Sequence, residues 1–135
     1  MLAMYVVLES YLSLVADYPA AYESQPGFEF IKEVPTVWDE TKVLDAKPGQ
    51  FITIARRKGK DWYIGTITNH APRQFSIPLD FLGPGNYIAD VYRDGPDTDI
   101  NPNHLVKEIK KVSAATVISI EVNANGGEVM HLHLE

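Results

Sequence analysis

From Thr36 onward, apolar residues recur at every second position, in short runs separated by Gly, Asn, Asp and Pro. A period of two is typical of strands that bury one face. The runs 51–55 and 62–67 flank Arg57–Lys58–Gly59–Lys60, which predicts a hairpin with glycine in its turn. Further runs follow at 75–79, 86–93, 106–112, 116–122 and 129–134. This spacing predicts a mainly β fold, an antiparallel sandwich or barrel, and we expect a Greek-key-like β-sandwich of about seven or eight strands.

The first 35 residues follow a different pattern. Residues 2–16 are apolar around most of a helical circumference, which predicts an N-terminal α-helix of about four turns. Such a helix must be covered on more than one side, so it looks like part of a larger packed layer. Residues 17–35 are interrupted by proline and predict a connector with a short helix near 27–34. We therefore expect a helix and connector over 1–35 and a β-sandwich domain over 36–135.

Composition narrows the classes of function. The 135 residues suffice for one domain with a core, but not for two. With 12 basic and 18 acidic residues the net charge is -6, which argues against a nucleic-acid partner. The absence of cysteine removes disulfides, zinc-thiolate sites and thiol nucleophiles. The longest apolar run, residues 1–8, is far too short to span a bilayer, so no membrane partner is expected.

The acidic residues do not predict a catalytic pair. Asp39 and Glu40 are the only adjacent acidic residues, and neighbours on a strand point to opposite faces, so they cannot converge on one bond. The sequence also has no phosphate loop, nucleophile elbow or dinucleotide fingerprint. We expect no catalytic or cofactor-binding residue in this chain.

Two patterns resemble metal sites without completing one. Asp97, Asp99, Asn101 and Glu108 have the spacing of ligands in a calcium-binding loop, but Pro102 stands where that loop needs glycine. We interpret this segment as a turn between strands, where such residues are common. His131 and His133 share a strand face, but no third ligand is near in sequence, so we expect them to face solvent. No metal-binding residue is predicted.

Aromatic and basic residues offer two surface interpretations. Trp62 and Tyr63 are candidate carbohydrate contacts, because exposed aromatic rings stack on sugars; the alternative is that they fill the sandwich core. Lys107, Lys110 and Lys111 form a small basic cluster that we interpret as protection of an edge strand, not as a phosphate site.

Several ordered segments resemble one known family. They are similar to the barrel-to-sandwich connection and the C-terminal β domain of glycoside hydrolase family 97, which contains α-glucosidases and α-galactosidases. The segments are Ala16–Asp17–Tyr18–Pro19, residues 27–41, Ile54–Ala55–Arg56–Arg57, Asp61–Trp62–Tyr63–Ile64–Gly65, residues 78–82 and Tyr92–Arg93–Asp94–Gly95. Together they span nearly the whole chain.

The resemblance implies a non-catalytic accessory domain of a parent enzyme that acts on α-glycosidic bonds. Residues 2–16 would be the last helix of a catalytic (β/α)8 barrel, with Leu2, Val6 and Leu8 at the barrel interface. The catalytic carboxylates and the calcium-binding glutamates would lie upstream in that barrel, so calcium is expected only in the parent enzyme. The domain would also join subunits into a homo-oligomer.

The alternative function is a carbohydrate-binding module that holds starch-like oligosaccharides through Trp62 and Tyr63. For either function, the resemblance implies a periplasmic or secreted parent protein.

Overall fold

The computed structural model describes residues 2–15, 18–98, 100–101 and 103–135. In this part of the chain, eight strands follow three short helices. The helices are α1 (Met4–Val7), α2 (Pro19–Tyr22) and α3 (Phe28–Glu33). The strands are β1 (Glu40–Lys47), β2 (Phe51–Lys58), β3 (Asp61–Thr68), β4 (Arg73–Pro78), β5 (Tyr87–Asp94), β6 (Leu105–Val112), β7 (Val117–Val122) and β8 (Gly127–Leu134).

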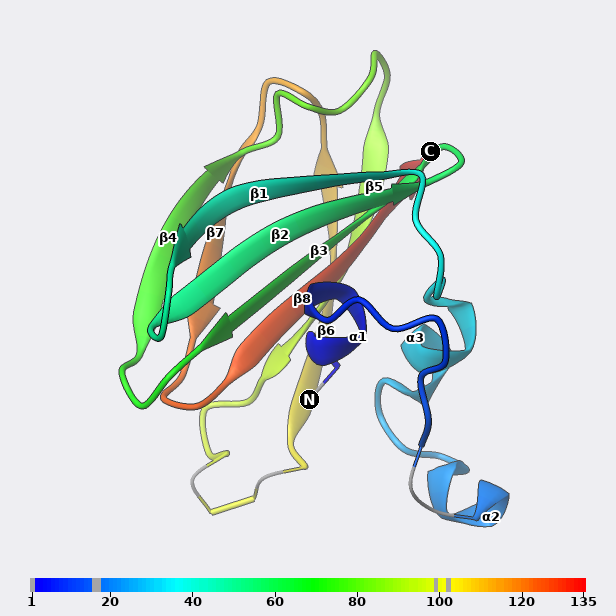
Figure 1. Cartoon of the computed structure of the whole chain (residues 1–135), viewed down its shortest axis with the longest axis vertical. Coiled ribbons are helices and arrows are strands. Elements are labelled where there is room, and N and C mark those ends of the chain that lie inside the picture. The colour runs from blue at the N-terminus through cyan, green and yellow to red at the C-terminus, as the bar shows by residue number, and fades with distance from the viewer. Residues whose placement is uncertain (1, 16–17, 99, 102) are drawn as a thin grey trace.

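The strands form two antiparallel sheets. Six of them make one sheet in the order β1-β2-β3-β8-β5-β6, and β4 pairs with β7 in a second, smaller sheet (Figure 1). The last strand, β8, lies between β3 and β5 and pairs with both. The C-terminal strand therefore joins strands β1–β3 to strands β5–β6 in one sheet. The predicted antiparallel β-sandwich and the hairpin around Gly59 are confirmed.

The main core lies between the two sheets. Strand β7 shows why, since exposed and buried residues alternate strictly along it and Ile118, Ile120 and Val122 face the six-stranded sheet. The largest fully buried side chains of this core are Ile64, Leu79, Val91, Ile120, Met130 and Leu132.

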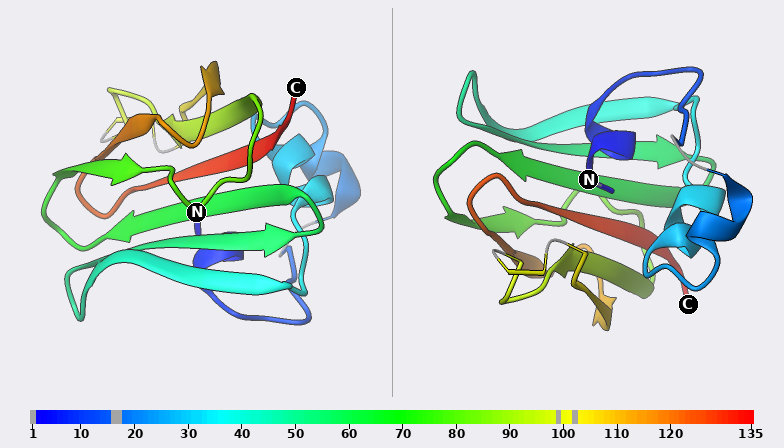
Figure 2. Two further views of the ribbon diagram at one scale, coloured as in Figure 1. Left: turned by 90° about the horizontal axis from the view of Figure 1, so that it is seen from above. Right: turned by 90° about the horizontal axis from the view of Figure 1, so that it is seen from below.

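A second apolar cluster covers the other face of the six-stranded sheet. Helix α3 contributes Phe30, which is 1% exposed and lies between the rings of Tyr63 and Tyr92, with centroids 6.2 and 5.5 Å away. Helix α1 contributes Ala3 and Val6 to the same cluster. Figure 2 shows both helices on this side of the sheet, away from β4 and β7. The predicted short helix near residue 28 is therefore confirmed.

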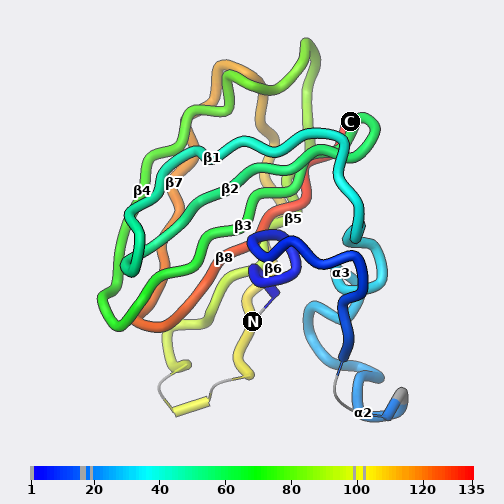
Figure 3. The backbone as a smooth tube through the Cα atoms, viewed as in Figure 1, coloured from blue at the N-terminus to red at the C-terminus, as the bar shows by residue number. Residues whose placement is uncertain are grey.

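The N-terminal helix is present, but its predicted length of about four turns is wrong. It ends at Val7, because Leu8 is already extended, and the described residues 8–15 contain no helix (Figure 3). A short helix depends on tertiary packing, and only this one turn has a sheet beneath it. Beyond it, the Ser10 hydroxyl donates a hydrogen bond to the carbonyl of Leu12 and competes with helical pairing.

Among the described residues, no helix is long and apolar enough to cross a membrane.

Candidate functional site

Helix α1 lies unusually close to the sheet because glycine occupies the strand beneath it. A Cβ atom at Gly65 would stand 2.9 Å from the Cβ of Val6 and 3.0 Å from the carbonyl oxygen of Ala3. A glycine within a strand often marks such a close approach of backbone. Val6 is fully buried as a result, so this turn is fixed to the domain and does not swing free.

Arg56 supports the end of α1 from below. Its guanidinium donates to the carbonyl of Val7 at 3.3 Å and stands 5.8 Å from the ring of Trp38. The residue is only 5% exposed, and within the described residues its Nε has no hydrogen-bond partner. Burying a cation is costly unless its donors are satisfied. The hydrogen bond to Val7 satisfies one donor of Arg56 and fixes the end of α1.

The segment that follows α1 presents apolar side chains to solvent. Leu12 and Leu14 are 73% and 76% exposed, and a groove of about 270 Å³ opens between this segment and α1. The exposed large apolar residues of residues 4–18 are Met4, Leu8, Tyr11, Leu12, Leu14, Val15 and Tyr18. Many exposed large apolar side chains in one short stretch are typical of an interaction surface, and we call these seven residues the apolar segment.

The predicted interface residues occupy three different environments. Leu8 is 50% exposed and belongs to the apolar segment. Val6 is buried against the domain's own sheet, and Leu2 is half-buried against the same cluster. Leu12 and Leu14 were not predicted as interface residues, because the predicted helix was too long, although both are apolar in the sequence.

The two candidate sugar contacts, Trp62 and Tyr63, are each 4% exposed and lie on opposite faces of β3. Trp62 packs against Phe81 between the sheets, with ring centroids 4.8 Å apart. Tyr63 packs under Trp38 on the other face, where burial and the charges of Asp61 and Glu33 raise its pKa to about 12. The structure therefore does not bring the two rings together, and neither presents a face to solvent.

Only one of the two strand histidines faces solvent as predicted. The side chain of His133 is 37% exposed and faces Asp90 at 3.3 Å. The side chain of His131 is 13% exposed and stacks on Tyr63 with centroids 4.4 Å apart, so its predicted exposure is wrong. His131 also lies 3.2 Å from Asp61 and 4.0 Å from Glu33, but among the described residues no group of three or more His, Cys, Asp or Glu is placed to hold a metal ion.

Asp39 and Glu40 organise the start of the β domain. Asp39 accepts a hydrogen bond from the backbone N–H of Gly59 at 2.7 Å, and this bond lowers the pKa of Asp39. Glu40 pairs with Lys42 and Arg57, which lower its pKa. Both carboxylates are thus held ionised in structural contacts at the β2–β3 hairpin.

The oxygen-rich loop after β5 uses its side chains internally. Asp94 accepts a hydrogen bond from the N–H of Gly127 at 3.0 Å, and Asp97 pairs with His104, which lowers the pKa of Asp97. Asp99 and Pro102 lie outside the described residues. No group of three or more His, Cys, Asp or Glu among the described residues is placed to hold a metal ion.

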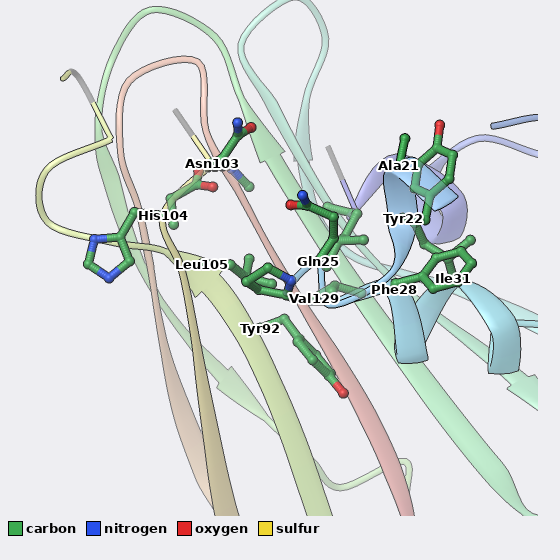
Figure 4. Close-up of a pocket in the computed structure, with 15 residues that line it drawn as sticks. Ala21, Tyr22, Gln25, Phe28, Ile31, Tyr92, Asn103, His104, Leu105 and Val129 are labelled. Carbon is green, nitrogen blue, oxygen red and sulfur yellow. Dashed lines mark hydrogen bonds between the residues drawn. The ribbon is translucent and has the colours of Figure 1, made fainter. Parts of the chain in front are cut away.

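A cavity of about 380 Å³ lies between the connector and the strands β5, β6 and β8. Figure 4 shows Tyr22, Gln25 and Phe28 on one wall, with Tyr92 and His104 across from them. The rings of Tyr22 and Phe28 are stacked with centroids 5.3 Å apart. The cavity is lined by side chains that hold the connector to the sheet.

Glu128 is a buried carboxyl group beside a smaller polar cavity of about 190 Å³. One oxygen accepts a hydrogen bond from the N–H of Glu121 at 3.3 Å, and the other has no partner among the described residues. Arg93, its neighbour across the strands, is paired with Glu108 at 2.7 Å. Burial consequently raises the pKa of Glu128 to about 7.

Comparison with known proteins identifies the domain. Residues 37–133 match the family described as glycosyl-hydrolase 97 C-terminal, oligomerisation. A retaining α-galactosidase of Bacteroides thetaiotaomicron is 46% identical over 95 residues, and a probable retaining α-galactosidase of Streptomyces bingchenggensis is 33% identical over 127 residues. These matches cover 70% and 93% of this chain but only 14% and 19% of the two relatives.

Solved structures of family 97 and related enzymes superpose on nearly the whole of this chain. A glycoside hydrolase family 97 enzyme from Pseudoalteromonas sp. strain K8, solved in complex with acarbose, superposes with a TM-score of 0.91 at 37% identity, over 97% of this chain and 22% of that one. A β-arabinopyranosidase superposes with a TM-score of 0.79 at 27% identity, over 96% of this chain and 20% of that one. The chain belongs to the glycosyl-hydrolase 97 C-terminal, oligomerisation family.

Proposed function

We propose that this chain is the non-catalytic C-terminal accessory domain of a glycoside hydrolase that acts on α-glycosidic bonds. It packs on the catalytic barrel through the apolar segment and holds subunits together through the β domain. The observation that carries this proposal is the exposure of seven large apolar residues over residues 4–18, next to a β domain that buries its own core. The two α-galactosidases it matches support the class of bond.

This proposal divides the chain at the connector. Residues 1–35 form the barrel side and residues 36–135 form the sandwich, although α1 itself is fixed to the sandwich through Val6. The family resemblance implies calcium for such an enzyme, bound by glutamates of the barrel; among the described residues of this chain no cluster is placed to hold a metal ion. We also propose that the parent protein is periplasmic or secreted.

The test of subunit association is sedimentation velocity of the 135-residue chain over a concentration series. We expect a reversible dimer or higher oligomer. A monomer at all concentrations would overturn the oligomerisation role. Adding maltooligosaccharide separates the rival carbohydrate-binding function: association untouched by sugar supports our proposal, whereas saturable sugar binding would favour the rival.

The barrel contact is tested with Leu12→Ser and Leu14→Ser together. Both side chains are exposed in this chain, so the free energy of unfolding of the chain alone should change by less than about 0.5 kcal/mol. In the parent enzyme the same pair of changes should lower the melting temperature, because the leucines are buried there. The control is Ile109→Ser, which removes a 67% exposed apolar residue from β6. Equal effects of the two changes in the parent enzyme would contradict the proposed contact.

A further inference from the structure

Strand β1 is an open edge of the six-stranded sheet. It pairs with β2 on one side, and Figure 2 shows it as the outermost strand of that sheet. Val43, at its centre, is 61% exposed, and among the described elements no backbone hydrogen bond reaches its outer side. An edge strand presents unpaired N–H and C=O groups that another strand can bind.

The charges of β1 are arranged so that opposite charges face each other when two copies of the strand pair antiparallel. Its sequence is Glu40–Thr41–Lys42–Val43–Leu44–Asp45–Ala46–Lys47. If a second copy pairs antiparallel about a two-fold axis between Val43 and Leu44, Lys42 faces Asp45 of that copy. The same register places Glu40 opposite Lys47, and Thr41 opposite Ala46.

Facing residues in an antiparallel pair must lie on the same face of the sheet, and a β-bulge in β1 provides this. The register to β2 shifts between Val43 and Asp45. As a result Lys42 pairs with Ala55 and Asp45 pairs with Thr53. Ala55 and Thr53 are two residues apart and lie on the same face of β2, so Lys42 and Asp45 also share a face.

The same bulge aligns the outer charges of the strand. Glu40 pairs with Arg57 and Lys47 pairs with Phe51, which share the face of Ala55. Without the bulge, one residue of each facing pair would point to the wrong side. A bulge usually discourages edge pairing, but here it brings the charged residues of each facing pair, and Thr41 with Ala46, onto matching faces. The central residues Val43 and Leu44 lie on opposite faces, because Leu44 packs toward the main core.

Two of the charges in this pattern have no ion-pair partner in the part of the chain that the structure describes. Among the described residues, neither Asp45 nor Lys47 makes an ion pair, whereas Glu40 contacts Lys42 at 2.9 Å and Arg57 at 3.1 Å. Opposite charges facing each other across strands stabilise pairing. A second copy would therefore supply the missing partners of Asp45 and Lys47 twice, once on each side of the axis.

The opposite edge of the sheet is less self-complementary. If β6 pairs antiparallel with a second β6 about Ile109, Glu108 faces Lys110, but Lys107 faces Lys111 and the two lysines repel. Lys107 and Lys111 are also already paired, with Glu29 and Glu135. This agrees with their predicted role in protecting an edge strand.

We propose that a second copy of this chain binds along β1, in antiparallel two-fold register, so that two six-stranded sheets join into one. This inference rests on the proposed oligomerisation function and assigns its contact surface. The family match begins at residue 37, so it includes β1 and excludes the whole apolar segment. Such two-fold interfaces use the same patch on both subunits.

The first test reverses charges in the full 135-residue chain, in the background of Leu12→Ser and Leu14→Ser to remove association through the apolar segment. Lys42→Asp and Asp45→Lys should each weaken the dimer at least about tenfold, because each places two like-charged pairs at the interface. The two changes together restore opposite charges and should recover most of the affinity. Lys60→Asp, in the β2–β3 turn, is the matched control and should leave the dimer unchanged.

The second test uses the absence of cysteine from the chain. Thr41→Cys and Ala46→Cys together should give disulfide-linked dimers under mild oxidation, because these positions face each other in the proposed register. Within one strand they are about 16 Å apart, well beyond disulfide reach. Each single variant should stay unlinked, since its two copies are equally far apart across the axis.

The outcomes separate the inference from the function on which it rests. Rescue by the paired charge reversal and linkage only in the double cysteine variant support the β1 interface. A dimer that persists through every β1 variant without linkage overturns the interface and leaves oligomerisation standing. A chain that is monomeric in all forms overturns both. Circular dichroism of each variant confirms that it is folded.

Discussion

Glu128→Gln is expected to stabilise the domain above neutral pH. Burial raises the pKa of Glu128 from its ordinary value of 4.5 to about 7. The folded chain therefore keeps this proton to a higher pH than the unfolded chain does. Between these two values the unfolded state binds fewer protons, so stability falls as pH rises and levels off above about 7.

The size of the effect follows from the shift. A difference of 7 against 4.5 corresponds to about 3 kcal/mol of lost stability at pH 8 compared with pH 4, at 1.36 kcal/mol per unit. Glutamine keeps an acceptor for the N–H of Glu121 and carries no charge. The variant should thus match the native chain near pH 4.5 and exceed its stability by up to about 3 kcal/mol at pH 8.

The assay is urea unfolding of both proteins at several pH values from 4.5 to 8.5. The difference between them removes the contribution of all other titrating groups, including Asp39 and Glu108, whose lowered pKa values act at lower pH. Glu23→Gln, at an exposed position, is the control for removing one negative charge.

Two results would refute this reasoning. A difference that does not vary with pH would show that Glu128 has the same pKa in both states. A variant that is less stable than the native chain at pH 8 would show that Glu128 is held ionised by Arg93, which the structure instead pairs with Glu108.

Three further changes test the packing and the absence of a metal site. Gly65→Ala should destabilise by about 2 kcal/mol through overpacking against Val6 and should reduce hydrogen-exchange protection of α1, although glycine-to-alanine changes in strands usually stabilise; unchanged protection would contradict this close packing. Phe30→Ala should cost about 3 to 4 kcal/mol in urea unfolding, because its ring fills the space between Tyr63 and Tyr92; a loss below about 1 kcal/mol would mean that α3 contributes little. Calcium and chelator should each leave the melting temperature of this chain unchanged, and a rise with calcium would reveal a metal site.

The sequence by itself determined the local elements of this protein. The two-residue period located strands β2 to β8 but not β1, Gly59 marked the hairpin turn, and Phe28, Phe30 and Ile31 marked helix α3. These features depend on neighbouring residues, so they can be read along the chain. The resemblance to the family also came from ordered local segments.

Tertiary structure decided where the apolar residues of the first segment and of β3 go. The period of two shows that Trp62 and Tyr63 face opposite sides, but the burial of both comes from distant residues such as Phe81 over Trp62 and Trp38 and Phe30 over Tyr63. Likewise α1 stops at Val7 because the sheet supports a single turn, at Gly65, and the leucines beyond it stay exposed. Helix length and exposure depend on residues that are distant in the sequence and lie together only in the folded sheet, where β8 pairs with β3 and β5.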